Sequence, residues 1–395
     1  MNAVKPSWWL ISLLASVIAV TPLAIDMYLP AMPQIAAALS SDADAMQQSL
    51  SIYLLCYAAG MLLFGPLADV LGRRTLALFG LASFALCSFF LSQTDSIQGF
   101  LVGRGLQALL GSAATVVIPG FIRQLYQEHT AKGMSYVGIV MMLAPLVAPA
   151  VGSALLLLDD WRLIFVVLGS YALLILVLCS VYLPHTETPR QGQKPDFLGA
   201  YREVLGHRRT RPLLLLSMSA SFGFFGFLTA VSFIYIGHYQ VSALTFSWLF
   251  GANVVCLMLG NFINGKLVPK LGSVQLLRYT TSIALIAAAG LLLVALLDGP
   301  LWATALCIAP LMSSLGLSAT NADALTLLDF PRHAGTATAV IGTLRFGAGA
   351  LAGPALALGV DGALLPFALV MGLGAVGVSV SRYWFAKHAP AQLAH

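Results

Sequence analysis

Four charged residues lie inside long apolar stretches of this 395-residue sequence, namely Asp26, Arg104, Asp323 and Arg345. An ionised Asp near the centre of a bilayer costs about 2.5 to 3.5 kcal/mol on insertion scales, so such a residue usually faces a cavity or a partner. Burial disfavours the charged form of a carboxyl group, which suits a group that takes up and releases protons. We therefore interpret Asp26 as the first candidate proton site. The alternative is an acid at a helix end among wet lipid headgroups.

Arg104 lies about seven residues into its apolar run. At a rise of 1.5 Å per residue, this places it roughly 11 Å from the start of that helix. That depth can bring its guanidinium near Asp26. A fixed positive charge favours the deprotonated carboxylate, so movement of Arg104 would change when Asp26 gives up its proton. A static ion pair between the two residues is the competing interpretation.

Asp323 and Arg345 stand in consecutive apolar runs on either side of Pro331. Counted from Pro331, Asp323 lies about 9 Å along one helix and Arg345 about 18 Å along the next, an offset that a long arginine side chain largely closes. Buried charges of opposite sign suggest first a mutual pair. There are two alternatives to such a pair. Asp323 is a second proton site, or the two charges recognise a polar or anionic substrate.

The apolar runs that hold these residues predict transmembrane helices. The composition is 59% hydrophobic and 9% charged, and the mean hydropathy of +0.89 excludes an ordinary soluble domain. A helix needs roughly 20 apolar residues to cross a bilayer core about 30 Å thick. Such runs occur at roughly 8–30, 46–68, 75–93, 98–122, 134–157, 162–183, 212–236, 244–264, 275–297, 300–327, 334–358 and 363–385.

This pattern predicts an all-α integral membrane protein with twelve transmembrane helices in two six-helix, pseudo-symmetric bundles. The bundles are residues 1–183 and 212–395, and the polar stretch 184–211 joins them. Lys and Arg concentrate in alternate loops, whereas the opposite loops carry acids and only Arg162 as a basic residue. Because cytoplasmic loops retain positive charge, we expect the linker and both termini in the cytoplasm.

The sequence lacks the residues that several other classes of function require. The basic residues sit in short loops rather than along one soluble face, which excludes a nucleic-acid surface. The five cysteines lie singly in apolar runs without CxxC spacing, as packing residues do. No Walker loop, zinc spacing or nucleophile elbow is present. We therefore expect no metal, no cofactor and no enzyme activity, and an ion gradient as the energy source.

A weak internal repeat supports two related halves. Gly65-Pro-Leu67 with Gly72 follows the second run, and Gly265-Lys-Leu267 with Gly272 follows the eighth, 200 positions later. Parallel repeats of six spans match the architecture of major facilitator transporters. The second copy has Pro269 where the first has Asp69, so only the first keeps its acid.

The first copy, GPLADVLGRR, resembles the major facilitator signature between the second and third helices. Its glycines permit a tight turn and close packing, and its acid can pair with basic groups or a helix N-terminus. In the family this loop latches the two halves in the outward-facing state. Val70 replaces a common basic residue, and an ordinary charged turn is the alternative. The gating residues that this resemblance implies are Gly65, Asp69, Gly72, Arg73 and Arg74.

The segment LAPLVAPAVGS holds Pro145, Pro149 and Gly152. The prolines remove backbone hydrogen bonds and the glycine lets helices approach, so we expect a bent helix. The segment resembles the fifth-helix motif of drug/proton antiporters, with Ala148 where glycine is commoner. This resemblance implies export; a structural kink is the alternative.

Four further strings, IDMYLPAMP, LVGRGLQALLG, WRLIF and LDFPRHAGTATAV, resemble the bicyclomycin and chloramphenicol resistance (Bcr/CflA) branch of these antiporters across nearly the whole chain. The resemblance implies a proton-coupled multidrug exporter of the bacterial inner membrane, working by alternating access, and we expect a monomer. It also implicates Arg104 in proton coupling. Asp323 and Arg345 depart from the branch, which usually has uncharged residues there. A carrier that exports a nucleoside or sugar, or a membrane receptor or scaffold, are the alternatives.

Aromatic, methionine and amide side chains provide walls suited to lipophilic drug substrates. Taken singly, each of them is more often a packing residue than a ligand contact. The predicted cavity residues are Tyr28, Tyr53, Tyr57, Met141, Phe224, Phe225, Tyr235, Trp248, Asn253, Asn321 and Arg345.

Overall fold

The structure is a computed structural model that describes residues 8–126, 130–184, 197–330, 334–359 and 363–388. Over these ranges the chain is helical and contains no β-strand. Eleven of the described helices are long and apolar enough to cross a membrane. The predicted all-α class is confirmed. The count differs from twelve because one helix of 54 residues spans two of the predicted runs.

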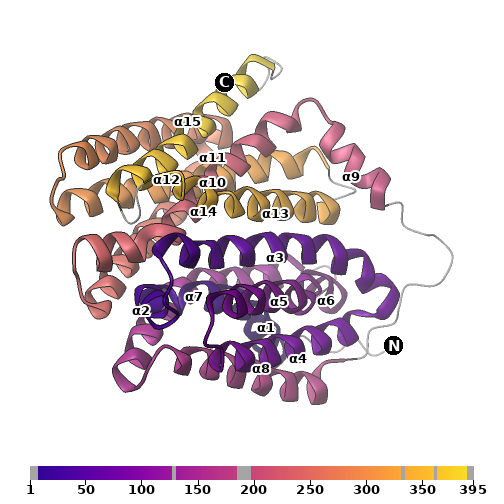
Figure 1. Cartoon of the computed structure of the whole chain (residues 1–395). Helices are drawn as coiled ribbons and strands as arrows, with labels where there is room; N and C mark the ends of the chain where they lie inside the picture. The colour runs from indigo at the N-terminus through magenta and orange to yellow at the C-terminus, as the bar shows by residue number, and fades with distance from the viewer. Residues whose placement is uncertain (1–7, 127–129, 185–196, 331–333, 360–362, 389–395) are drawn as a thin grey trace. The chain divides into compact units, whose positions relative to one another are not determined.

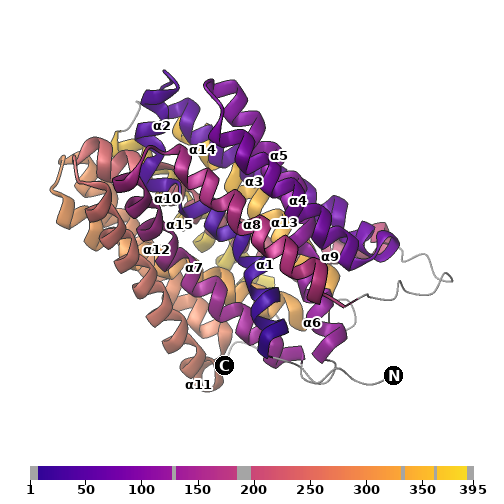
Figure 2. The same ribbon diagram turned by 90° about the horizontal axis from the view of Figure 1, so that it is seen from below.

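The chain divides into two compact units, and the first comprises Met1–Ser41 and Ile52–Lys194. Within this unit α4 packs against both α5 and α8, while α1 packs against α7 (Figures 1 and 2). The helices are α1 (Trp8–Asp26), the 3-10 turn η1 (Leu29–Ala31), α2 (Met32–Ala38), α3 (Ala43–Leu71), α4 (Arg73–Ser92), α5 (Ile97–Val116), α6 (Ile118–Tyr126), α7 (Thr130–Leu158) and α8 (Arg162–Tyr182).

The second unit comprises Asp42–Ser51, the first turns of α3, and Pro195–His395. Here α11 packs along α12, and α10 packs against both α12 and α15. The helices are α9 (Phe197–Gly206), α10 (Thr210–Ser232), the π-helix η3 (Phe233–His238), α11 (Ala243–Leu296), α12 (Leu301–Leu328), α13 (Ala334–Ala350), α14 (Ala352–Leu356) and α15 (Leu364–His388).

The backbone of the predicted repeat recurs in both units. Gly72, between α3 and α4, has φ 84° and ψ 140°, and Gly272, inside α11, has φ 75° and ψ 155°. They are the only described glycines with positive φ, and glycine alone adopts this conformation without a steric cost. Ser40 and Gln240, also 200 positions apart, both have positive φ. Gly272 therefore divides α11 into two helical segments, as Gly72 separates α3 from α4.

Part of the predicted linker is a helix. Residues 185–196 lie outside the described part, but α9 follows them and packs on the second unit through a buried apolar cluster. Arg209, just beyond α9, forms an ion pair of 3.1 Å with Asp329 at the end of α12. The cluster consists of Val204, Leu214, Phe330, Ala337, Val340 and Ile341.

Candidate transport sites

Asp26 is the last residue of α1 and is only 3% exposed. This burial does not fit an acid among wet headgroups. Among the described residues, no side chain or backbone group forms a hydrogen bond or ion pair with its carboxyl group. The carboxyl group also stands at the negative end of the helix dipole, which disfavours an added negative charge. Its surroundings therefore favour the neutral acid.

Arg104 is completely buried on α5, where two aromatic rings hold it. Its Cζ atom lies 4.3 Å from the ring centroid of Tyr28 and 4.3 Å from that of Tyr53. Its Nη1 donates to Gln107 Oε1 at 2.7 Å, while Nε and Nη2 have no hydrogen-bond partner among the described residues. Among the described residues Arg104 forms no ion pair with Asp26, so the static pair, which was the competing interpretation, is not present.

The segment that carries Asp26 nevertheless touches Arg104. Tyr28, two residues after Asp26, presents its ring to the guanidinium. On the other side Tyr53 is stacked on Tyr57, with ring centroids 6.4 Å apart and planes 8° apart. Tyr57 shares a hydrogen bond of 2.8 Å with Thr115 Oγ1. Of the three predicted cavity tyrosines of the first unit, Tyr28 and Tyr53 contact Arg104, Tyr57 is stacked on Tyr53, and all three are buried.

Gln107 is a functional candidate that the sequence reasoning missed. It accepts from Arg104 and donates through Nε2 to Ser88 Oγ at 2.8 Å, and Ser88 in turn donates to Phe84 O at 2.7 Å. Gln107 and Ser88 are fully buried. The i, i+3 spacing of Arg104 and Gln107 places both on one helix face and was the available signal.

The fifth-helix motif meets the end of α1. Pro145 and Pro149 lie inside α7, which continues through both. Gly152 lies against the backbone next to Asp26, since a Cβ there would overlap Met27 O and come within 3.3 Å of Pro30 Cγ. The predicted close approach at Gly152 is confirmed, and it is made to the segment that holds the buried acid.

The signature loop is fastened inside the first unit. Arg73 Nη1 donates to Gln124 Oε1 of α6 at 3.1 Å, and Arg74 Nη2 donates to Ser180 O near the C-terminus of α8. Gly72 makes the predicted turn. The expected close packing at Gly65 is wrong, because a Cβ there would have its nearest neighbour 4.0 Å away.

Asp69, the acid of the same loop, falls at the end of α3. Its side chain lies outside the described part of the structure.

The predicted pair in the second unit is confirmed. Arg345 Nη1 lies 2.9 Å from Asp323 Oδ2, Ser217 Oγ donates to Asp323 Oδ1 at 2.7 Å, and Arg345 Nε donates to Ser221 Oγ at 2.9 Å. α10, α12 and α13 thus contribute to one network. In contrast to Asp26, Asp323 has a counter-charge and a hydroxyl partner.

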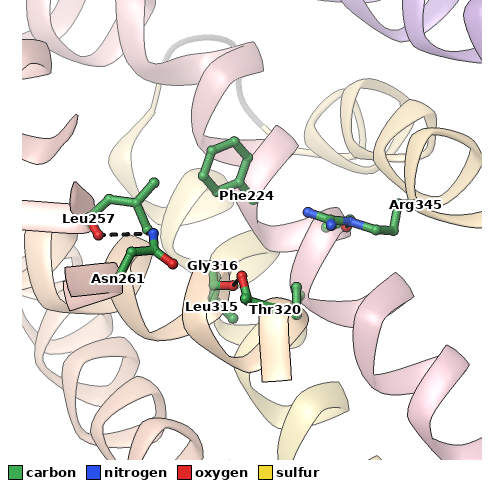
Figure 3. Close-up of a pocket in the computed structure, with 10 residues that line it drawn as sticks. Phe224, Leu257, Asn261, Leu315, Gly316, Thr320 and Arg345 are labelled. Atoms are coloured by element: carbon green, nitrogen blue, oxygen red, sulfur yellow. Dashed lines mark hydrogen bonds between the residues drawn. The ribbon is translucent and has the colours of Figure 1, made fainter. Parts of the chain in front are cut away.

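A pocket of about 150 Å³ lies beside this network, among α10, α11, α12 and α13 (Figure 3). Of the predicted cavity residues, Phe224 and Arg345 line it. Sequence reasoning missed its other polar residues, Ser221, Asn261 and Thr320, because single small polar residues are common in membrane helices. Thr320, one of these lining residues, is exposed.

The remaining predicted cavity residues do not line this pocket. Phe225 packs edge-on against Phe224, and Tyr235 packs against Phe246. Asn321 is buried and donates to Asn264 Oδ1 at 2.9 Å, which joins α12 to α11. Asn253 is buried, whereas Met141 and Trp248 are exposed.

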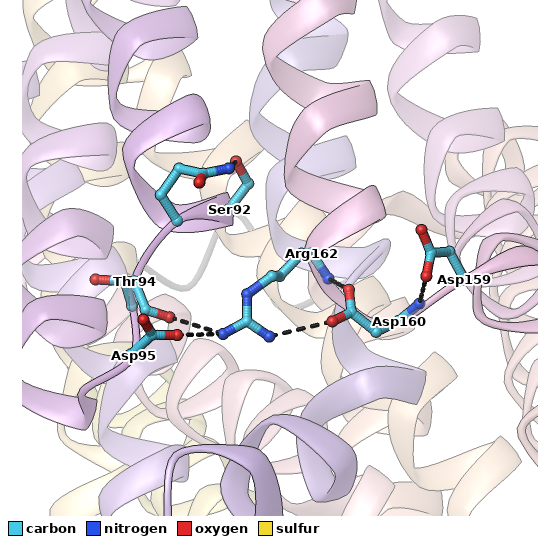
Figure 4. Close-up of polar contacts among 7 residues, drawn as sticks. Ser92, Thr94, Asp95, Asp159, Asp160 and Arg162 are labelled. Atoms are coloured by element: carbon cyan, nitrogen blue, oxygen red, sulfur yellow. Dashed lines mark hydrogen bonds and ion pairs between the residues drawn. The ribbon is translucent and has the colours of Figure 1, made fainter.

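Arg162 forms a separate cluster in the first unit (Figure 4). It bonds Asp95, before α5, and Asp160, before α8, and its Nη2 also donates to Thr94 O at 3.3 Å. The cluster joins two loops and has a half-exposed arginine, so we interpret it as a structural clamp. Over the described residues, no group of three or more His, Cys, Asp or Glu side chains is placed to hold a metal ion.

Comparisons with known proteins agree with this architecture. The family model described as Major Facilitator Superfamily matches residues 14–354. The bicyclomycin resistance protein homolog of Haemophilus influenzae is 32% identical over 98% of both sequences. A chloramphenicol resistance protein of Pseudomonas aeruginosa is 32% identical over 68% of this chain and 66% of its own. These relatives confirm the predicted resemblance to the bicyclomycin and chloramphenicol resistance branch.

Among solved structures, an inward-facing, occupied bacterial homologue of the human lysosomal transporter Spinster aligns with a TM-score of 0.75. The alignment covers 96% of both chains at 15% identity, so it supports the fold alone. The family match and the full-length relative decide the assignment. The chain belongs to the Major Facilitator Superfamily and is a membrane transporter rather than an enzyme.

Proposed function

We propose that the protein is a proton-coupled exporter of drug-like molecules that works by alternating access in the bacterial inner membrane. It acts as a monomer with both termini in the cytoplasm, and it needs the proton gradient but no cofactor. The names of its relatives support antibiotics as substrates. The paired glycines Gly72 and Gly272 support twelve transmembrane helices in two six-helix bundles, with Gly272 between the eighth and ninth.

The observations that carry the proposal are the buried carboxyl group of Asp26, which has no partner among the described residues, and the incompletely bonded Arg104, which contacts the same segment through Tyr28. A buried acid without a counter-charge is most stable when protonated. If the α1 end shifts so that Nε and Nη2 of Arg104 reach Asp26, the carboxylate becomes favourable and the proton leaves. Tyr28 follows Asp26 by two residues and its ring contacts Arg104, so it would move in such a shift.

Proton movement can drive such export because a unit charge crossing the membrane is worth about 2.3 kcal/mol per 100 mV, before any pH term. The substrate need only bind one conformation better than the other to be carried with the cycle. In this cycle the position of Arg104 controls whether Asp26 is charged or neutral.

The test is efflux from an efflux-deficient host, with chloramphenicol as the first compound in a resistance screen. We expect Asp26→Asn to abolish active efflux while the protein is still expressed and folded. Asp95→Asn changes an acid in the Arg162 cluster and should keep efflux. Full efflux by Asp26→Asn, or efflux by the unmodified protein that a protonophore does not reduce, would contradict the proposal.

A further inference from the structure

Arg345 has bonding capacity left over beside the pocket of the second unit. A guanidinium carries five N–H donors. Nη1 bonds Asp323 and Nε bonds Ser221, whereas Nη2 makes no hydrogen bond to the described residues. The side chain is 36% exposed and lines the pocket. A ligand in the pocket therefore meets a charged donor that still has a free side.

The acid of the pair is not part of the pocket wall. Asp323 does not line the pocket, and its side chain is 19% exposed. Its Oδ1 accepts from Ser217 and its Oδ2 from Arg345. The pocket thus presents the positive member of a neutral pair, which favours a carboxylate or carbonyl oxygen and disfavours a cation.

The other walls suit a flat apolar group. Phe224, Leu257 and Leu315 provide an aromatic and two aliphatic surfaces. Asn261 lies opposite Arg345 (Figure 3), and its Nδ2 already donates to Leu257 O. The hydroxyl of Thr320 donates to Gly316 O. Arg345 is consequently the strong donor of the pocket.

The volume limits what fits. Pockets for whole drug-sized ligands usually measure about 300 to 1,000 Å³, whereas this one holds about 150 Å³. It accommodates one ring with a polar substituent, and the remainder of a larger substrate would extend outside it.

We propose that this pocket is a substrate subsite that selects an aromatic or similarly flat group bearing a carboxylate or another hydrogen-bond acceptor, and that it rejects cationic groups. Arg345 determines this specificity, and Asp323 and Ser221 position it. The inference rests on the proposed transport function, because it treats the pocket as part of the substrate path.

Benzoate, benzamide and benzamidine test the proposal, because they share one shape and are anionic, neutral and cationic. Their binding to the full-length protein in lipid nanodiscs is measured by ligand-observed NMR, against empty nanodiscs. We expect benzoate to bind tightest and benzamidine weaker by about tenfold or more, as one hydrogen bond to a charged group predicts. Equal or tighter binding of benzamidine, or no binding by any probe, would overturn the proposal.

Variants of the protein test whether Arg345 causes the preference for benzoate over benzamidine. The double change Arg345→Gln with Asp323→Asn removes both charges without leaving either buried alone, and it should abolish the preference for benzoate. Arg345→Lys keeps the charge and should keep the order of the probes with weaker binding. Arg162→Gln removes a paired arginine elsewhere and should change nothing. An unchanged preference in the double variant, or a reversed order in Arg345→Lys, contradicts the proposal.

This equilibrium measurement uses no gradient, so its outcome is independent of proton coupling. If the probes bind as expected but efflux does not depend on protons, the subsite stands and the proposed function fails. If efflux is proton-dependent but benzamidine binds best, the proposed function stands and the subsite fails.

Discussion

The buried charges of the two units are stabilised in different ways. Asp323 and Arg345 neutralise each other and share hydroxyl partners. Asp26 has no partner among the described residues, and Arg104 relies on two tyrosine rings and one amide. A satisfied pair resists change, whereas incompletely bonded groups gain from rearrangement. The first unit therefore holds the residues suited to proton exchange.

Gln107 should matter for the stability of Arg104. Gln107→Leu removes the only described hydrogen bond of a buried guanidinium, and hydrogen bonds to charged groups contribute about 1.5 to 3 kcal/mol. We expect the free energy of unfolding to fall by about that amount in a denaturation assay of the purified protein. Gln93→Leu changes an exposed glutamine on the neighbouring loop and serves as the control. Equal effects of the two changes would show that Gln107 does not hold Arg104.

At the level of helices, Gly152 links the fifth-helix motif to the segment that holds Asp26. Gly152→Ala would place a Cβ on Met27 O, so either α7 or the end of α1 must move. We expect a loss of about 1 to 3 kcal/mol in stability, typical of overpacking, and a lower efflux rate. Gly138→Ala lies in the same helix with no atom within 4 Å of the new Cβ and should preserve both. Normal efflux by Gly152→Ala would show that the contact between the fifth-helix motif and the Asp26 segment is not needed for transport.

The repeat predicts that substitution of Gly72 and of Gly272 lowers the stability of the protein by similar amounts. Gly72→Ala and Gly272→Ala each force a residue with a Cβ into a positive-φ, extended-ψ conformation that is essentially restricted to glycine, at a cost of about 1 to 3 kcal/mol. Gly65→Ala and Gly265→Ala are the controls, because both glycines are helical and neither new Cβ would clash. Denaturation of the four variants should show two destabilised proteins and two unaffected ones. If Gly272→Ala is as stable as Gly265→Ala, the turn in α11 does not need glycine.

The helices were largely predictable because apolar runs and their breaks report membrane spans directly. The Asp323–Arg345 pair was predictable too, since consecutive antiparallel helices are neighbours and only depth had to be matched. Depth alone left two possibilities open for Arg104 and Asp26, a moving arginine and a static ion pair. It does not tell which way a side chain points around its helix, and Arg104 is directed to Tyr28 and Tyr53 instead. The docking of α9 was also missed, because a short polar stretch carries little periodic signal.

For the whole molecule, the two units have the same turn geometry but different chemistry. The positive-φ positions recur at an interval of 200 residues, while the buried acid and arginine of each unit stand at unrelated positions. Such a division suits a transporter in which the first unit handles the proton and the second recognises part of the substrate. Each task can then change in evolution without disturbing the other.

Proton release on substrate binding shows whether Asp26 carries the proton that is exchanged for substrate. The purified protein, in weakly buffered solution, is mixed with the compound to which its expression confers most resistance, and the pH change is recorded. We predict that the unmodified protein releases protons and that Asp26→Asn binds the compound without releasing any. Asp323→Asn should still release them. Undiminished release by Asp26→Asn would contradict the account and point to Asp323 instead.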